Sequence, residues 1–351
     1  MTRIFHYLVR RLTAGIFTML VLIAVAFAIY WATPSQPALF VYQPPPHHFT
    51  DYQIQQANHF LGLDKPKLTQ YVDYVWGLLH GSFGSNWDTA SYAFKQHTTM
   101  QPLRPVLMQE LGVTLSLLLG GALLVLLLSV PLGAFAGSRI GSLSDRTISL
   151  IALIGVCTHP MVIGLLLRSL VGGHLHWAPE SGYCSFTPSP YGLCGGPVDW
   201  ASHLALPWLT FALLFLALYT RMVRTSVSET LHEDYVRTAR AKGAREFRVI
   251  CRHVLPNASL RVMTMIGMEI GTTIGVCIFI ETAYGLNGLA QAGLLAMVET
   301  QNLPTTLGVV TCVGLLVVVG GLLVDVLYAV VDPRAGNVTE TRTKSLAGGV
   351  I

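Results

Sequence analysis

The sequence predicts an all-α integral membrane protein with six transmembrane helices and a helical extracytoplasmic insertion after the first of them. Of the 351 residues, 52% are hydrophobic and only 11% are charged, whereas a typical soluble domain carries about 25% charged residues. The charge-free runs are long enough to cross a bilayer, and the basic residues collect in alternate connections between them. This distribution follows the positive-inside rule. The net charge of +4 therefore reflects membrane sidedness and gives no indication of nucleic-acid binding.

The first span is predicted at Leu12–Ala32, and residues 1–32 form the first of three parts of the chain. Arg3, Arg10 and Arg11 precede this uncharged run. At about 1.5 Å per residue, the run covers roughly 30 Å, the thickness of a hydrocarbon core. A cleaved signal peptide has a shorter apolar core of about 7–15 residues. The sequence thus favours an uncleaved helix that starts in the cytoplasm.

Residues 33–110 are predicted to form the extracytoplasmic insertion, because they are polar, aromatic and rich in proline. A turn of glycine and serine at 81–85 and several short stretches between turns indicate short helices. His47 and His48 are adjacent in this part, but no further ligands follow them at a metal-binding spacing. We interpret the pair as part of a surface loop, and no metal site is predicted.

The third part, 111–351, is predicted to be a core of five spans, at 112–136, 147–167, 204–220, 262–280 and 305–331. The connection at 221–261 contains nine Lys and Arg residues, whereas the connections at 172–203 and 283–304 contain none. Because basic residues accumulate on the cytoplasmic side, this pattern places the 221–261 loop and both chain termini in the cytoplasm.

Three side chains inside the predicted spans are candidates for a polar pathway or for structural pairing: His159, Glu269 and Asp325. A charge at the bilayer centre costs about 2.5–3.5 kcal/mol on insertion scales, so such groups should face protein or water. Pro160 predicts a kink in the third span. Two roles fit His159 equally well. It could face the pathway, or it could be packed in the protein and bonded to a backbone carbonyl. Glu269 lies nearer mid-span and is a pathway candidate, whereas Asp325, near the cytoplasmic end, is expected to be structural.

Cys184 and Cys194 are candidates for a disulfide, because both lie in the connection predicted to face the outside. The other four cysteines fall in predicted spans or on the cytoplasmic side, where thiols stay reduced. A disulfide would close the loop between them. Two free thiols are the alternative.

Residues 229–258 are the longest strongly charged stretch of the chain. A helix with one small apolar strip is predicted there from four side chains, Tyr235, Val236, Ala239 and Phe247. Gly243 follows Ala239 by four positions, which places both on one helical face and predicts a shallow site where another surface can approach. The simpler interpretation is a solvated helix in a cytoplasmic loop.

The same stretch carries a resemblance to a known family. The run DYVRTARAKG, from Asp234 to Gly243, is similar to that of the dipeptide, oligopeptide and nickel permeases of bacterial ABC importers. The spacing from Gly243 to Leu255 and Pro256 resembles the G-x9-I-x-L-P end of the cytoplasmic loop in ABC-importer permeases. The general loop pattern has Glu where this chain has Arg237, and Ile where it has His253.

Further segments resemble the same family, so the resemblance covers nearly the whole chain. They are LGLDKP at 61–66, WAPESGY at 177–183, ETAY followed by GL at 281–289, and LLVDVLYAVVDPR at 322–334. The chain departs from the family at 287–290 and 301–304, where relatives commonly have P-G-L-G and R-D-Y-P. Because these positions are expected to face outward near the substrate route, the departures put substrate transfer in question more than the fold.

The resemblance implies a permease subunit with the type I ABC importer fold in the inner membrane of a bacterium. A coupling helix would dock into a groove of an ATPase subunit, using Tyr235, Arg237, Ala239, Arg240, Lys242, Gly243, Leu255 and Pro256. Of these, the basic side chains would steer onto acidic rims of that groove, and Leu255-Pro256 would end the coupling segment. Glu281 becomes a further pathway candidate.

The implied partners are a second homologous permease, two nucleotide-binding ATPase subunits, an extracytoplasmic substrate-binding protein and membrane lipid. No cofactor is expected on this chain, because ATP and Mg would be bound by the ATPase subunits. Peptides are the expected substrate class, since dipeptide and oligopeptide systems are the majority of the family. Glutathione and nickel are its other substrates.

Two other classes of function fit the sequence less well. A self-sufficient proton-coupled secondary transporter could use Glu269, Asp325 or His159 as a relay, but it has no need of the 229–258 loop. An intramembrane hydrolase lacks support, because the HExxH pattern is broken after His232-Glu233 and no G-x-S-x-G elbow occurs. The chain also has no G-x-x-x-x-G-K-[ST] motif. ATP used for transport would therefore be bound by another polypeptide.

Overall fold

The computed structural model describes residues 2–33, 37–43, 48–143, 145–148, 150, 158–187 and 194–331. Within these ranges the secondary structure is helical, apart from one β-bridge between Ser85 and Pro102. The chain divides into two compact units, which we describe separately.

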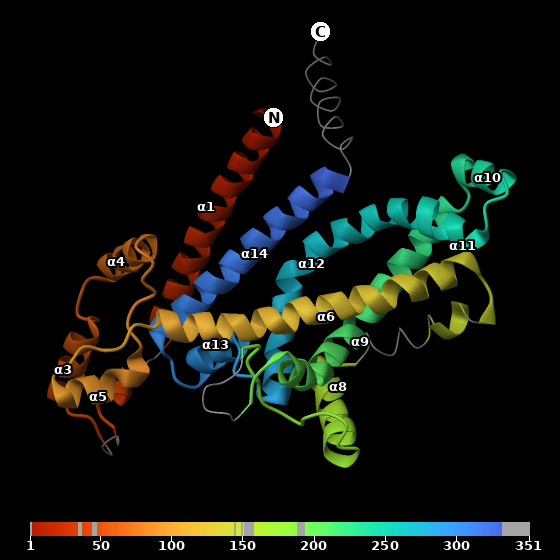
Figure 1. Ribbon diagram of the computed structural model, residues 1–351. Helices are drawn as coiled ribbons and strands as arrows, with labels where there is room; N and C mark the ends of the chain where they lie inside the picture. The colour runs from red at the N-terminus through yellow and green to blue at the C-terminus, as the bar shows by residue number, and fades with distance from the viewer. Residues whose placement is uncertain are drawn as a thin grey trace, which may run out of the picture. The chain divides into compact units, whose positions relative to one another are not determined.

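The first unit consists of residues 1–116, 181–183 and 277–318. It holds the long helix α1 (Thr2–Ala32) and the helices of the insertion, which are α2 (Ala38–Val41), α3 (Asp51–Leu61), α4 (Lys67–Leu79), η1 (Trp87–Thr89) and α5 (Ala90–Gln96). It also holds α13 (Leu289–Val298), the start of α6 (Arg104–Ser138), the end of α12 (Leu255–Tyr284) and the start of α14 (Leu303–Val331) (Figure 1). Helix α6 begins before the predicted end of the insertion at residue 110.

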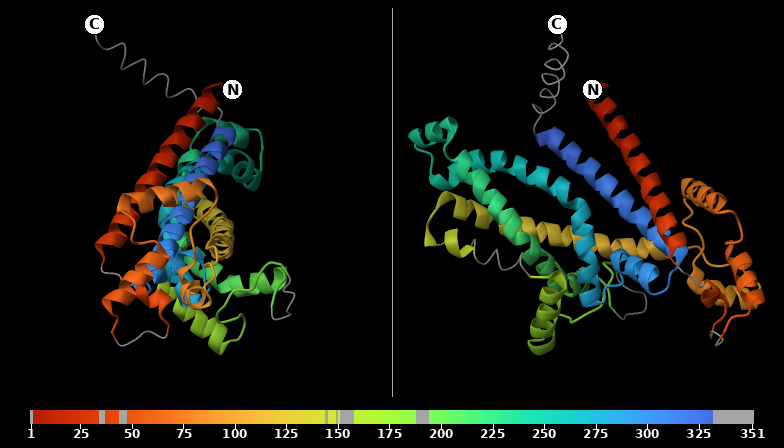
Figure 2. Two further views of the ribbon diagram at one scale, coloured as in Figure 1. Left: turned by 90° about the vertical axis from the view of Figure 1, so that its left-hand side faces the viewer. Right: turned by 180° about the vertical axis from the view of Figure 1, so that it is seen from behind.

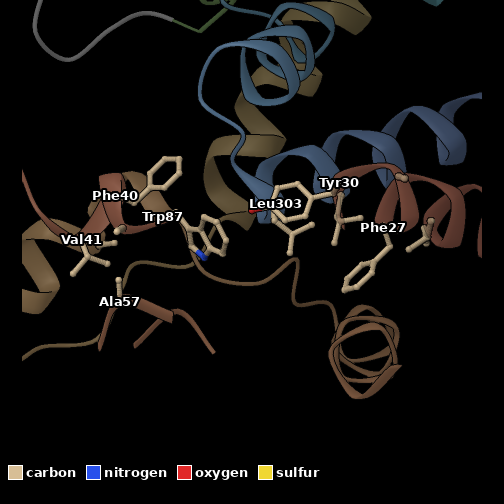
Figure 3. Close-up of a cluster of buried hydrophobic side chains, with 12 residues drawn as sticks. Phe27, Tyr30, Phe40, Val41, Ala57, Trp87 and Leu303 are labelled. Carbon is tan, nitrogen blue, oxygen red and sulfur yellow. The ribbon is translucent and has the colours of Figure 1, made fainter. Parts of the chain in front are cut away.

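An aromatic cluster joins the insertion to α1 and α14. Figure 3 shows Phe27 and Tyr30 of α1 and Leu303 of α14 on one side of Trp87, with Phe40 of α2 on the other. The rings of Phe40 and Trp87 meet edge to face, with centroids 5.4 Å apart. Because such buried aromatic side chains contribute large apolar areas, this cluster fixes the insertion against the two long helices.

Local sequence signals explain the ends of α3. Thr50 forms a capping box with Gln53, in which each side chain bonds to the other residue's backbone N–H. Gly62 ends the helix in the left-handed conformation, with φ of 74°. The LGLDKP segment therefore begins with the C-terminal cap of a helix.

The second unit consists of residues 117–180, 184–276 and 319–351. Its helices in the described part are α8 (Pro160–Leu167), the π-helix η2 (Arg168–His174), α9 (Pro197–Thr230), α10 (Asp234–Ala241), α11 (Glu246–Val249), the π-helix η3 (Ile250–Val254) and the remaining parts of α6, α12 and α14.

Glycines let α6 and α9 pack closely in this unit. A Cβ on Gly121 would lie 2.7 Å from the Phe211 ring, and one on Gly133 would lie 2.8 Å from the Thr220 carbonyl oxygen. Gly137, one turn further on, approaches the Arg224 carbonyl in the same way. Close contact through small residues is the usual route to helix association in membranes.

By length and composition, four helices of the described part are candidate membrane spans: Arg10–Ala32, Arg104–Ser138, Pro197–Thr230 and Leu303–Val324. A fifth candidate is the broken pair Gly271–Tyr284 and Leu289–Val298, which is bent by 86°. The predicted third span at 147–167 falls partly outside the described residues. An all-helical membrane protein is thus established, whereas the six-span count stays a prediction.

One local prediction was wrong. Pro160 does not kink a helix but begins one: it is the first residue of α8, where its missing N–H costs nothing. The connection at 283–304 contains α13, whose axis is bent by 86° from the end of α12 at Tyr284. Left-handed backbone at Gly285 and Asn287 makes that turn.

Candidate functional site: the α10–α11 hairpin and the membrane carboxyl groups

Helices α10 and α11 form a compact hairpin between the two long helices α9 and α12 (Figure 1). Helix α10 ends in a Schellman motif, in which the Gly243 N–H bonds to the Arg240 carbonyl and the Ala244 N–H to the Ala239 carbonyl. Gly243 has a φ of 80°, which residues with a side chain rarely adopt. The glycine of the family motif is therefore the residue that reverses the chain.

This geometry corrects the prediction that Ala239 and Gly243 share a helical face. The helix stops at Ala241, so Gly243 lies beyond its end. Apart from Gly243 itself and its two chain neighbours, no described residue has an atom within 4 Å of a Cβ placed on Gly243, and the residue is exposed. It offers an open site at the tip of the hairpin, not a groove along α10.

An ion pair closes the hairpin across this turn. Arg240 donates from Nη2 to Glu246 Oε1 over 2.5 Å and from Nε to Oε2 over 3.1 Å. The Arg240 guanidinium lowers the pKa of Glu246. Since the two side chains are 40% and 55% exposed, the pair contributes about 0–1 kcal/mol. Arg240 thus has a partner within its own chain. Lys242 is exposed, and the ion pair of Arg237 with Asp234 is long, at 3.9 Å.

The hairpin is fixed to the base of α12 by Tyr235. Its hydroxyl accepts a hydrogen bond from Asn257 Nδ2 at 3.0 Å and donates one to the His253 carbonyl at 3.5 Å. Val236 is fully buried beside it, but Phe247 is 80% exposed. The predicted apolar strip therefore exists around Val236 and does not include Phe247.

Leu255 and Pro256 do not end the segment as expected. Leu255 is the first residue of α12, and its N–H bonds to the Ile250 carbonyl across the π-helix η3. Pro256 lies in the first turn of α12, a position that tolerates the loss of an N–H. The chain therefore runs from α11 through η3 into α12 as continuous helix.

A partly buried ion pair that sequence reasoning missed links the turn after α6 to α9. Asp145 lies after the turn that follows α6. Its carboxylate accepts hydrogen bonds from both Nε and Nη2 of Arg224, the second at 2.7 Å. It also accepts from the Gly141 N–H at 3.0 Å. Arg224 and these bonds lower the pKa of Asp145 to about 2. No local motif marks Asp145, because its partner is 79 positions away.

Glu281, a predicted pathway residue, is fully buried in the first unit and caps a helix. Its carboxylate accepts from the Thr114 hydroxyl at 2.6 Å and from the Gln291 N–H at 2.8 Å. Thr114 in turn accepts from the Leu289 N–H. Glu281 and Thr114 together satisfy N–H groups in the first turn of α13, where negative charge is favoured.

The other candidates occupy different places. Glu269 lies within α12, and its Oε2 is buried with no hydrogen-bond partner in the described part of the chain. His159 is the N-cap of α8, accepting from the Met161 N–H at 3.3 Å. Asp325 lies in α14, but its side chain is outside the described residues.

Cys184 and Cys194 form a disulfide, with Cα atoms 5.7 Å apart. The Cys184 sulfur lies 3.5 Å from Nε2 of His203 on α9. Among the described residues, no group of three or more His, Cys, Asp or Glu side chains gathers as metal ligands would.

The sequence matches two family models that together cover most of the chain. Residues 129–337 match the binding-protein-dependent transport system inner membrane component, and residues 4–118 match the N-terminal part of such membrane components. The chain belongs to this family. It is a multi-pass inner-membrane permease subunit of an ABC importer and not an enzyme.

Similar proteins include a putative peptide permease protein of Brucella ovis, 32% identical over 330 residues, which are 94% of this chain and 98% of the relative. The dipeptide transport system permease protein DppB of Escherichia coli K12 is 30% identical over 345 residues, with the same coverage of both chains. The oligopeptide transport system permease protein AppB of Bacillus subtilis 168 is 30% identical over 328 residues, covering 93% and 98%.

One solved structure shares the fold. It is a chain of the MetNI methionine ABC transporter in an inward-facing conformation, with a TM-score of 0.52 and 17% sequence identity. The match covers 66% of this chain and 98% of the other. The shared fold therefore spans nearly all of that chain, whereas about a third of this chain lies outside the match.

Proposed function

We propose that this chain forms half of a translocation pathway for peptides, dipeptides or oligopeptides, and transmits force from separate ATPase subunits through the α10–α11 hairpin. Relatives named as peptide, dipeptide and oligopeptide permeases match nearly its full length, which supports the substrate class. Membership of this family favours an importer subunit over a self-sufficient proton-coupled transporter.

The proposed topology has six spans, both termini in the cytoplasm and most of the insertion outside. The nine basic residues of 221–261 support a cytoplasmic hairpin. The partners are a second homologous permease, two ATPase subunits that bind ATP and Mg, and an extracytoplasmic substrate-binding protein. Together the two permeases would enclose the pathway.

The observation that carries the coupling proposal is the construction of the hairpin. Arg240–Glu246, the Tyr235–Asn257 bond and the buried Val236 hold it as one body. It is joined by continuous helix to α12 and by a short turn to α9. A push on its tip is therefore passed to two long helices. The exposed Lys242 and Arg237 favour an acidic docking surface.

Gly243→Trp tests this role. The tip is open, so the indole would occupy the space that a partner needs at the docking surface. We expect a purified transporter that hydrolyses ATP at a rate near that of wild type, while substrate uptake into vesicles is lost. Uptake and hydrolysis are measured on the same reconstituted sample.

Gly62→Trp is the matched control. Gly62 is also the C-terminal cap of a helix, with a φ of 74° and nothing within 4 Å of an added Cβ. It carries the same backbone strain but lies in the insertion, so uptake should persist. Normal uptake by Gly243→Trp, or equal loss in both variants, would refute the docking assignment.

A further inference from the structure

Helix α4 of the insertion has a wide apolar surface of which only half is covered by protein. At about 100° per residue, its apolar side chains occupy more than half of the helix circumference. Tyr71, Tyr74 and Leu78 form one half of this surface and pack against the aromatic cluster of Figure 3. The other half is exposed: Leu68 by 75%, Val72 by 54%, Trp76 by 64% and Leu79 by 74%.

The polar side of α4 is already paired with its own chain. Gln70 donates to the carbonyls of Leu63 and Lys65 at 3.1 and 2.8 Å. Asp73 accepts from Lys65 Nζ at 2.7 Å. The segment that leads into α4 therefore covers the polar side, and the exposed surface that remains is apolar.

Contacts of α4 place it at the depth of the membrane spans. The Tyr71 hydroxyl donates to the Leu20 carbonyl of α1 at 3.2 Å, and the Tyr74 hydroxyl meets Thr311 Oγ1 of α14 at 3.1 Å. Both partners lie within candidate spans. Leu20 is roughly 18 Å along the helix from the end of α1 at Ala32, at about 1.5 Å per residue.

The start of α4 lies nearer the end of the span. Lys67 Nζ lies 5.0 Å from the centre of the Trp31 ring, and the Tyr71 ring meets Phe27 with centroids 6.0 Å apart. Figures 1 and 2 show α4 beside the α1 ribbon in every view. Helix α4 therefore lies alongside the membrane-spanning length of α1 and not beyond its end.

We propose that α4 is embedded in the bilayer and that Leu68, Val72, Trp76 and Leu79 contact lipid hydrocarbon. Helix α1 also has exposed apolar side chains, at Phe17, Val21, Val25 and Ile29. Exposed apolar surface of this extent is stabilised by transfer out of water. An amphipathic helix with such a surface is typical of the membrane interface.

Lipid fits this surface better than a second protein does. Protein interfaces carry about one hydrogen bond per 100–200 Å², but the four exposed side chains offer a single donor, the Trp76 indole N–H. Hydrocarbon requires no polar partners. The proposal needs only that α1 and α14 cross the membrane, so it does not rest on the peptide substrate or on coupling. It also means that residues 33–110 are not wholly outside the bilayer.

Nitroxide accessibility tests the proposal on the assembled transporter in phosphatidylethanolamine–phosphatidylglycerol vesicles. Spin labels are attached at Val72→Cys, Trp76→Cys and Leu79→Cys, one at a time, with the free cysteines changed to serine and the Cys184–Cys194 disulfide retained. Tyr52→Cys on α3, where Tyr52 is 72% exposed, is the control in the same insertion. Collision with oxygen, which concentrates in hydrocarbon, is compared with collision with a water-soluble nickel chelate.

We expect the oxygen-to-nickel ratio at the α4 positions to be several-fold higher than at Tyr52→Cys. A ratio equal to that of the control would place α4 in water and overturn the proposal. Low collision with both reagents and an immobilised spectrum would show that a second permease covers the surface, which also overturns it. The labelled positions are exposed, and three of them are used so that one poorly folded variant does not decide the result.

Discussion

Glu281 shows how a motif residue can serve the fold within a transport protein. It belongs to the ETAY…GL segment that resembles the permease family, and that resemblance made it a pathway candidate. Its two oxygens are instead bonded to Thr114 and to the first turn of α13. The glycine of the same segment, Gly288, has an ordinary extended backbone. Its role is to leave space, since a Cβ there would contact the carboxyl group of Glu281.

Gly288→Ala is therefore expected to destabilise the protein by about 1–3 kcal/mol, the usual cost of overpacking a well-filled site. The measurement is the thermal unfolding midpoint of the purified protein in one detergent. Gly112→Ala is the control, because nothing lies within 4 Å of its added Cβ and it lies inside helix α6. That variant should be neutral or stabilised by about 0.5–1 kcal/mol.

A double variant separates the clash from other effects of the alanine. With Glu281→Ala also present, the added methyl group has room. The losses of stability caused by the two single substitutions should therefore not be additive in the double variant. If Gly288→Ala unfolds at the same temperature as the wild type, or if the losses are strictly additive, the proposed contact is wrong.

At the scale of the element, the long charge-free runs predicted where helices would lie but not how they end. The run at 112–136 marks a span, yet α6 begins at Arg104, because a helix can continue past the hydrocarbon with polar residues. Proline is compatible with a kink and with a helix start, so Pro160 alone did not decide between them. The cap on α13 depends on Thr114, 167 positions from Glu281. One sequence gives no sign of such a pairing.

The Asp145–Arg224 pair ties the turn after α6 to α9, close to where the chain enters the α10–α11 hairpin. Asp145 has a pKa of about 2 in the folded chain, against an ordinary value of 3.8. Because the folded value is the lower one, the pair stabilises the fold above about pH 4, and this stability is lost as the pH falls toward 2. The shift corresponds to roughly 2 kcal/mol.

Unfolding midpoints of wild type and Asp145→Asn, measured from pH 7 down to pH 3, check this prediction. The wild type should be more stable at pH 7, and the difference should narrow below about pH 4. Asp73→Asn is a matched control, since it breaks an exposed pair with Lys65 that contributes about 0–1 kcal/mol. A difference for Asp145→Asn that stays constant across the range would show that protonation of this group is not responsible.

At the scale of the whole molecule, this chain has the features of one component of an assembly. Its sequence has no phosphate-binding motif for ATP, yet it carries a rigid basic hairpin between two long helices. Purification of the tagged chain from native membranes in mild detergent should therefore bring down a second permease and P-loop ATPases in near-equal amounts.

The physical reason is that the proposed coupling role needs a partner that moves the hairpin, and the exposed cations on it favour an acidic surface. Mass spectrometry of the purified sample identifies the subunits, and an unrelated tagged inner-membrane protein purified in the same way sets the background. Because salt screens exposed charges, raising the ionic strength should release the ATPases before the second permease, which is expected to associate through apolar helix surfaces. Recovery of the chain alone, with uptake that collapses with the proton gradient but ignores ATP depletion, would instead support the self-sufficient transporter.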